Sequence, residues 1–287
     1  MTPASSPETN GSGSSRGWGR LERGNAGLLV CGAFLVILLA RGGFFSPAAW
    51  VGFGEKFHQN FILDGRYRML IDGLKATLIM TFFATVIGLF LGLLISVIRV
   101  AHRGGARIGL LNALANLYIV VMRGTPVMVQ LLIWNFSIFA AVRDINTLHV
   151  AILAFGLNSG AYVAEIFRGG IEAVDPGQME AARSLGLPYR VAMLRVVLPQ
   201  AFRNVVPMLF NEFITLLKET SVAGYIGIDD LTRAGQNIQA LTLEHSQPLV
   251  MVALIYLAMV LVLTELVRRL ERWLHRSVGR RRRPRPR

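Results

Sequence analysis

The chain has 287 residues, of which 53% are hydrophobic and only 16% are charged, and it carries a formal net charge of +13. Soluble globular proteins usually contain about 25% charged residues, so this composition excludes an ordinary soluble domain. The cations gather at loop ends and at the C-terminus, which indicates anchoring to anionic membrane lipid and not nucleic-acid binding. The single cysteine, Cys31, lies in an apolar run, so no disulfide within the chain and no thiolate metal site is expected.

The N-terminal region predicts a tail followed by an anchor helix. Residues 1–26 are rich in Ser, Gly, Thr and Asn and lack apolar periodicity, which predicts a disordered tail. Residues 27–45 form an apolar stretch that is just long enough to span a membrane, for which about 20 residues are needed. A secretory signal is the competing interpretation, but no small-x-small cleavage site follows Ala40, so a retained anchor is favoured. Residues 46–69 predict an external interfacial loop.

Five further apolar blocks predict the core membrane-spanning helices of an all-α polytopic membrane protein. They cover residues 70–98, 121–142, 150–171, 205–226 and 249–267. The second block is interrupted near its start by the sequence RGTP at 123–126, and proline there predicts a break. A charged insert, residues 172–200, separates the third block from the fourth.

The positions of the basic residues predict the orientation. If the N-terminal tail is cytoplasmic, the segments 1–27, 99–123, 168–203 and 268–287 lie inside and hold 3, 4, 5 and 10 Lys or Arg residues. The outside loops hold 4, 1 and 1, so the bias is 22 to 6 in favour of this arrangement. By the positive-inside rule, the charged insert and both termini are therefore expected to be cytoplasmic.

The charged insert predicts two short helices joined by a tight turn. Asp175 is a good N-cap, Pro176 suits the first helical position, and Gln178 completes a capping box. The first helix runs to Leu185, and Gly186 is expected to adopt the left-handed conformation that ends it.

A second helix is expected to begin after Pro188 and to run over residues 189–197. Pro199 is expected to stop or kink it. From the residues alone, an ordinary interfacial loop remains an equal alternative.

The spacing of this insert resembles the cytoplasmic signature of ABC importer permeases. The matching positions are Glu180-Ala181-Ala182, then Gly186, then Val196, where isoleucine is commoner, and finally Leu198-Pro199. Three other blocks, 117–126, 160–171 and 217–221, resemble the polar amino-acid branch of that family. The resemblance covers roughly residues 68–272 and leaves out the N-terminal anchor and the Arg-rich tail, 273–287.

The resemblance implies a type I ABC importer permease fold. Five core transmembrane helices in residues 70–272 would join one N-terminal anchor helix, with a cytoplasmic coupling helix between the third and fourth core spans. We call residues 172–200 the coupling region. The residues implied to dock the ATPase are Glu180, Ala181, Ala182, Arg183 and Gly186.

The resemblance also implies the partners and the location. These are an ATP-binding cassette ATPase dimer, a second permease subunit (a second copy or a paralogue), an extracytoplasmic solute-binding protein and an amino-acid solute. The expected location is the bacterial inner membrane. The chain contains no phosphate-binding loop of the form GxxxxGK[ST], so it is expected to be a transport subunit and not an enzyme. No cofactor or metal site is expected.

Polar residues inside the predicted spans are candidates for the translocation pathway, because an ionised side chain at mid-bilayer costs about 2.5–3.5 kcal/mol. Asn211, Thr215 and Lys218 are spaced to share one helical face, with Glu219 beside it. Structural pairing between helices is the alternative role for them. Glu165 is the fifth candidate, although a local pair with Arg168 is the more favoured role. The candidates are Glu165, Asn211, Thr215, Lys218 and Glu219.

Other functions remain as alternatives. The chain could be an ABC importer permease for another small polar solute. A secondary transporter often shows repeated halves, and no self-similar pair of apolar segments is evident here. A scaffold that docks a partner without transport would not need the polar residues at 211–221.

Overall fold

The computed structural model describes residues 52, 54–142, 144–244 and 246–279, and in the last helix it describes side chains as far as Arg272. The predicted tail 1–26, the predicted anchor 27–45 and the cationic end 280–287 lie outside the described residues. The chain divides into two units, 1–59 and 60–287, and all helices from α3 onward belong to the second. Every element in the described residues is helical, which confirms the all-α prediction.

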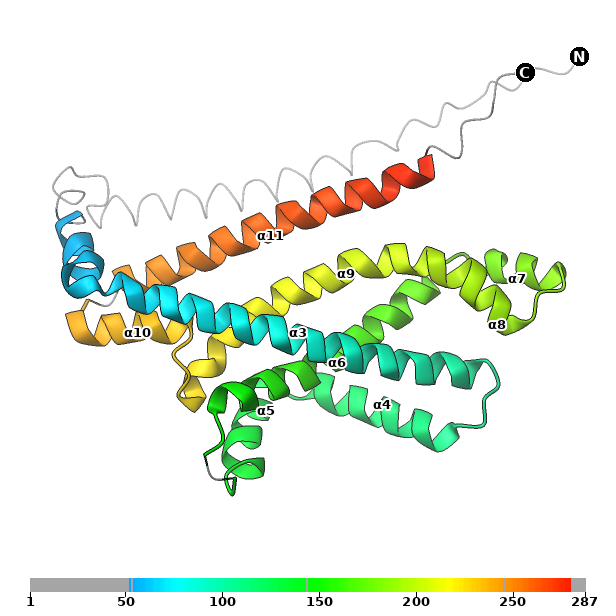
Figure 1. Cartoon of the computed structure of the whole chain (residues 1–287), viewed down its shortest axis with the longest axis horizontal. Helices are drawn as coiled ribbons and strands as arrows, with labels where there is room; N and C mark the ends of the chain where they lie inside the picture. The colour runs from blue at the N-terminus through cyan, green and yellow to red at the C-terminus, as the bar shows by residue number, and fades with distance from the viewer. Residues whose placement is uncertain (1–51, 53, 143, 245, 280–287) are drawn as a thin grey trace, which may run out of the picture. The chain divides into compact units, whose positions relative to one another are not determined.

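Helix α3 (Tyr67–Arg103) is the longest element and contains the first predicted core span. Two short turns, His58–Ile62 and Leu63–Gly65, precede it. Helix α3 packs along α6 (Thr147–Glu172), the predicted third core span. The two helices cross near the middle of the unit (Figure 1).

Small residues bring α3 and α6 into close contact. A Cβ atom added to Gly92 of α3 would lie 2.5 Å from Cγ1 of Val163, and one added to Gly156 of α6 would lie 2.8 Å from the Ile87 side chain. Small residues at the contact between two membrane helices allow their backbones to approach closely. A buried cluster that includes Met80, Phe155 and Leu216 lies in the same region.

The second predicted span is broken as expected, but it begins earlier than the sequence indicated. Helix α4 (Gly109–Gly124) ends at the RGTP sequence, and α5 (Val127–Ile133) continues after a bend of 106°, followed by a wider turn at Trp134–Ile138. The apolar block predicted to begin at residue 121 is therefore preceded by helix from Gly109, within the segment 99–123 that was expected between two spans. The apolar face of α4, which contains the buried residues Ala115 and Ile119, packs on α6 and α3, and this packing was not visible in the hydropathy.

The break in this span leaves backbone groups of the last turn of α4 without helical partners, and two buried side chains bind them. Gln130 of α5 donates from Nε2 to the carbonyl oxygens of Met122 and Thr125, at 2.8 and 3.0 Å. Asn158 of α6 donates to the same Met122 oxygen at 3.1 Å and to Oε1 of Gln130 at 3.1 Å. Within a membrane, irregular backbone is tolerated when protein groups bind it in this way.

The coupling region contains the two predicted helices. They are α7 (Pro176–Ser184) and α8 (Tyr189–Ala192), and a wider turn at Met193–Val197 joins α8 directly to α9 (Leu198–Glu219). The stretch predicted as the second helix, 189–197, ends at Val197, and α9 begins at Leu198 with Pro199 in its first turn. A proline there costs no helical hydrogen bond, which is why the chain continues as a helix.

The C-terminal part of the unit consists of one turn and two further helices. A tight turn at Thr220–Ile226 follows α9, and α10 (Leu231–Thr242) and α11 (Gln247–Gly279) complete the unit. Helix α10 packs on α3 and α11, and α11 packs on α9. Helices α7 and α8 lie at one end of α9, and α10 lies near the other (Figure 1).

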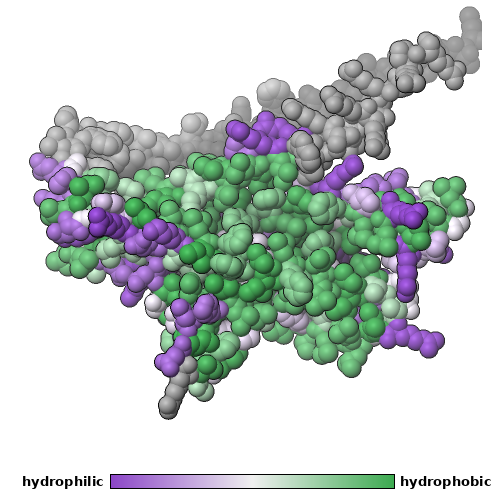
Figure 2. Space-filling model, in the orientation of Figure 1, coloured by the Kyte–Doolittle hydropathy of each residue, from purple (hydrophilic) through white to green (hydrophobic). Residues whose placement is uncertain are grey.

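Three described helices, α3, α6 and α11, are long and apolar enough to cross a membrane, and a fourth span results if α4 and α5 count as one broken span. Helix α9 carries the polar residues at 211–219 and is not among them, so its predicted role as a span stays a prediction. The visible face of the molecule is largely apolar across the middle, with hydrophilic side chains toward the ends (Figure 2).

Candidate functional site

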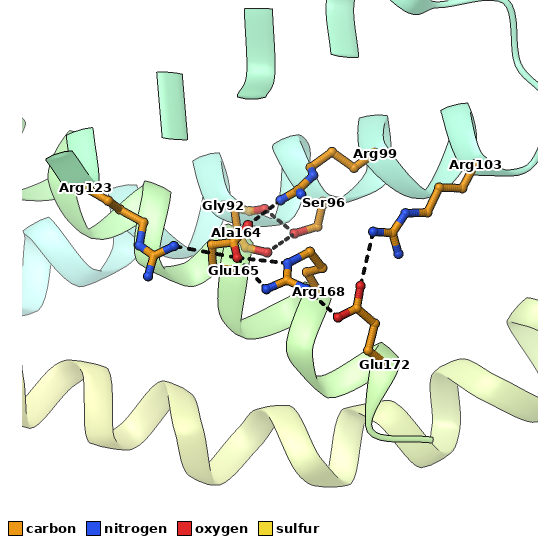
Figure 3. Close-up of polar contacts among 9 residues, drawn as sticks. All are labelled: Gly92, Ser96, Arg99, Arg103, Arg123, Ala164, Glu165, Arg168 and Glu172. Carbon is orange, nitrogen blue, oxygen red and sulfur yellow. Dashed lines mark hydrogen bonds and ion pairs between the residues drawn. The ribbon is translucent and has the colours of Figure 1, made fainter. Parts of the chain in front are cut away.

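A cluster of ionised side chains surrounds Glu165 near one end of α6 (Figure 3). Arg99 of α3 donates from Nη1 to Oε1 of Glu165 at 2.6 Å, and Arg168 of α6 lies 2.7 Å from Oε2. Arg123 of α4 lies 3.6 Å from the same Oε2. The Glu165–Arg168 pair predicted from the sequence is confirmed, and two further arginines join it from other helices.

A second carboxylate extends this cluster toward the end of α6. Glu172 accepts from Nη1 of Arg168 and from Nη2 of Arg103 of α3, the latter at 3.1 Å. We define the charged cluster as these six residues. They are Arg99, Arg103, Arg123, Glu165, Arg168 and Glu172.

The charged cluster joins three helices and keeps an excess of positive charge. Four guanidinium groups meet two carboxylates, which leaves a formal charge of +2. The Glu165 and Arg99 side chains are only 17% and 19% exposed, whereas Arg123 is 43% exposed. Arg123 also lies over the ring of Tyr162 of α6, 5.2 Å from its centroid. Of the three arginines that contact Glu165, Arg123 has the longest distance to it and the most exposed side chain. Arg123 can therefore bind an anionic group while Arg99 and Arg168 stay paired with Glu165.

The position of Arg123 depends on the break between α4 and α5. Arg123 is the last residue but one of α4, and the buried amides of Gln130 and Asn158 fix the carbonyl oxygen of its neighbour Met122. These two amides were not among the sequence-based candidates. The signal that could have found them is a buried amide close to a proline break in an apolar span, where free carbonyl groups need donors.

A second polar contact joins α6 to α9. Ser159 donates from Oγ to Oε1 of Glu212 at 2.9 Å. Ser159, Tyr162 and Glu165 follow one another at three-residue intervals, so they form a polar row on α6 that meets Glu212 of α9 and Arg123 of α4. Glu212 was not a sequence-based candidate, although it lies one turn from Thr215 and two turns from Glu219.

The other candidates lie on the same helix as Glu212 and differ in how exposed they are. Asn211, Thr215 and Lys218 are all exposed, as their predicted sharing of one helical face requires, and Glu219 is half-buried. The structure therefore places Glu165 and the three exposed candidates in two different settings. Glu165 is bound by arginines of this chain, whereas the three exposed residues form an uncovered surface that we call the polar face of α9.

The coupling region is held by local hydrogen bonds. Asp175 caps α7 by accepting from the Gly177 amide at 2.8 Å, and Gly186 has a φ of +83°, so the predicted N-cap and left-handed turn are confirmed. The expected capping box differs, because the Gln178 side chain accepts from Nε2 of Gln200 at 3.3 Å. The predicted first helix also ends at Ser184, one residue before the predicted Leu185.

The predicted docking residues differ in how accessible they are. Glu180, Ala181, Arg183 and Gly186 are exposed, whereas Ala182 is only 4% exposed and packs inward. Leu185 is 83% exposed and was not predicted to dock. Four of the five predicted residues are therefore accessible to a partner, and Ala182 is not.

The opposite end of the unit holds a polar cavity of about 450 Å³ near the start of α10. Its lining includes Tyr225, Asp230 and Arg233. Asp230 caps α10 by accepting from the amides of Thr232 and Arg233, at 2.9 and 3.2 Å. Burial raises the pKa of Asp230 above its usual value, even though these hydrogen bonds lower it. Across residues 52–279, as far as they are described, no three His, Cys, Asp or Glu side chains are grouped so that they could hold a metal ion.

Residues 104–276 match the family of binding-protein-dependent transport system inner membrane components. The chain belongs to this family. It is a permease subunit of an ABC importer in the bacterial inner membrane, and such subunits are not themselves enzymes; their importers also comprise an ATPase and a binding protein.

Two curated relatives share 38% identity with the permease. One is the arginine transport system permease protein ArtQ of Bacillus subtilis, matched over 204 residues that cover 71% of this chain and 91% of that protein. The other is the glutamine transport system permease protein GlnP of Escherichia coli, matched over 206 residues that cover 71% and 92%.

Two solved structures resemble the permease. A chain of an amino-acid ABC transporter crystallised with histidines is 41% identical, has a TM-score of 0.68, and is matched over 74% of this chain and 97% of its own. A chain of the methionine transporter MetNI in an inward-facing form shares the fold, with a TM-score of 0.62 at 22% identity, over 72% of this chain and 97% of its own. The type I permease fold predicted from the sequence is thereby confirmed.

Proposed function

We propose that this permease carries a polar amino acid, or a close derivative, from an extracytoplasmic binding protein into the cytoplasm. A separate ATPase would drive the alternation between outward and inward access. The names of its relatives, which are permeases for arginine and for glutamine, support an amino-acid solute. Another small polar solute is the alternative, and a panel of solutes in the uptake assay below would identify it.

The observation that carries this proposal is the exposed helix α7. The side chains of Glu180, Ala181 and Arg183, and that of Leu185 directly after the helix, are exposed. Ala182, which packs inward, and the Asp175 cap hold the helix in place. A fixed helix end with accessible side chains can enter a cleft of the ATPase and transmit its movement. The positive-inside bias supports a cytoplasmic location for this region and for both chain termini.

The polar face of α9 supports a second permease subunit. Asn211, Thr215 and Lys218 are exposed on a helix packed between membrane-spanning elements. An ionised group that faces lipid costs about 2.5–3.5 kcal/mol, so Lys218 requires protein or water as its neighbour. A second copy or a paralogue that faces this surface would enclose a polar pathway, to which Glu219, Glu212 and Glu165 would contribute from its edge.

The test of docking uses two glycines with the same backbone conformation. Gly186 and Gly105 have φ values of +83° and +92°, and a Cβ atom added to either would meet nothing within 4 Å. Valine at either position incurs a similar local penalty of about 1–2 kcal/mol. We expect Gly186→Val to reduce ATPase co-purification and solute-stimulated ATP hydrolysis by about tenfold, and Gly105→Val to leave both near the wild-type level. Equal behaviour of the two variants would contradict docking through α7.

The test of solute and pathway uses vesicles that contain the permease and its ATPase, supplied with the binding protein and a panel of amino acids. We expect uptake of one or a few polar amino acids. The substitution Lys218→Gln should change the apparent affinity or the choice of solute, while the matched change Lys75→Gln, in an exposed pair with Asp72 at 2.8 Å, should not. If no amino acid is taken up while another polar solute is, the solute assignment is wrong.

A further inference from the structure

An apolar groove of about 410 Å³ runs along α3 beside the coupling region. Its lining is mainly aliphatic and includes Leu93, Val97, Ile171, Met193 and Leu194. Leu93, Val97 and Leu194 are 48%, 57% and 64% exposed, so this chain does not fill the groove. A cavity of this volume with apolar walls can bury a small hydrophobic ligand or part of a larger one.

The length of the groove matches one leaflet of a bilayer. From Leu93 to Gly104, which both line it, α3 rises by about 16 Å at roughly 1.5 Å per residue. The hydrocarbon core of a bilayer is about 30 Å thick, so one leaflet contributes about 15 Å. An acyl chain that enters beside Gly104 and extends toward Leu93 would therefore be covered along its whole length.

The end of the groove beside the coupling region is cationic. Arg190 of α8 lines the groove, its side chain is exposed, and no carboxylate among the described side chains pairs with it. The start of α8 lies against the end of α3, because a Cβ atom added to Gly104 would come within 2.8 Å of the Tyr189 ring. This contact places Arg190 near Arg103, whose partner Glu172 also binds Arg168. A basic site beside an apolar groove is suited to an anionic headgroup attached to an acyl chain.

We propose that this groove binds one anionic phospholipid of the cytoplasmic leaflet, with an acyl chain along α3 and the headgroup phosphate at Arg190. The assignment to that leaflet rests on the proposed function, which places the coupling region in the cytoplasm. The bound lipid would occupy the space between α3, the end of α6 and α8. It would thereby support the coupling region from the side that faces the membrane.

The test measures lipid binding to the complex of permease and ATPase in detergent, by native mass spectrometry. The probes are palmitoyl-oleoyl phosphatidylglycerol and the zwitterionic palmitoyl-oleoyl phosphatidylcholine. We expect the wild-type complex to prefer the anionic lipid, and Arg190→Gln to weaken that binding by about fivefold, the amount expected for one cation near the surface. Arg195→Gln is the matched control, because Arg195 is an exposed cation three residues beyond the end of α8 that does not line the groove. Equal binding of the two lipids, or equal losses in the two variants, would overturn the proposal.

Two further variants separate this proposal from other outcomes. Val97→Phe should fill the groove and reduce binding of both lipids, whereas Leu194→Cys in a Cys31→Ser background reports on a second copy. Efficient disulfide linking of two chains through position 194 would mean that protein covers the groove, and would overturn the lipid assignment. Retention of the ATPase is recorded for every variant. A wild-type complex that retains the ATPase but shows no preference for the anionic lipid contradicts this proposal alone and leaves the docking proposal intact. Labelling of residue 194 from the extracytoplasmic side would contradict the proposed orientation, and with it the assignment to the cytoplasmic leaflet.

Discussion

The charged cluster and the coupling region are held in opposite ways. The charged cluster is partly buried, and its ion pairs join α3, α4 and α6 through residues that lie up to 69 positions apart. The coupling region is exposed, and hydrogen bonds between near neighbours, such as Asp175 and Gly177, fix its form. The first is suited to keeping helices together during a movement, and the second to passing that movement to another protein.

The largest effect is expected at the centre of the charged cluster. The substitution Glu165→Gln leaves Arg99, Arg123 and Arg168 without a shared counter-ion, and removal of one partner from a largely buried ion pair costs about 3 kcal/mol or more. We expect the melting temperature of the purified permease to fall by about 10 °C. A thermal unfolding assay in detergent measures this change.

The control for Glu165 is a pair that is exposed. Asp72 and Lys75 lie 2.8 Å apart with side chains 70% and 65% exposed, so Asp72→Asn should cost less than about 1 kcal/mol. A loss for Glu165→Gln as small as that for Asp72→Asn would mean that the charged cluster does not hold the three helices together.

A smaller effect is expected where α6 meets α9, and two adjacent glycines of α6 make a matched pair. A Cβ atom at Gly170 would lie 2.3 Å from Cγ2 of Val205, a stiff side chain, whereas one at Gly169 would meet nothing within 4 Å. We expect Gly170→Ala to destabilise by about 1–3 kcal/mol and Gly169→Ala to stabilise by up to about 1 kcal/mol. Thermal unfolding of both variants tests this, and a stabilised Gly170→Ala variant would show that α9 shifts easily on α6.

The two regions also differ in how far the sequence alone could predict them. The coupling region could be predicted almost completely, because the cap at Asp175 and the turn at Gly186 depend on residues within a few positions. Its clear difference from the prediction is the capping box, because the Gln178 side chain instead meets Gln200, which lies 22 positions further along the chain. The long apolar helices followed from hydropathy in the same way.

The charged cluster could be predicted only in its local part. The pair of Glu165 and Arg168 follows from their spacing on one helix, but the additions of Arg99 and Arg123 depend on how α3 and α4 pack against α6. The same limit applies to Glu212, whose partner Ser159 is on another helix. The early start of α4 was missed because apolar residues occur both in helices and in loops at a membrane surface. The apolar outward face of α4 therefore did not distinguish a helix from such a loop.

The smallest effect on stability is expected from two side-chain helix caps of the same kind. Because they lie in different parts of the molecule, they show whether the place of a cap matters for coupling. Asp175 accepts from the Gly177 amide at 2.8 Å in the coupling region, and Asn146 accepts from the Leu148 amide at 2.9 Å at the other end of α6. Replacement of either by alanine should cost about 1 kcal/mol of stability. Only Asp175→Ala loosens the start of α7, so only this variant should lower solute-stimulated ATP hydrolysis, by roughly two- to fivefold. If both caps lower hydrolysis equally, the exposed end of the molecule has no special role in coupling, and global stability governs transport.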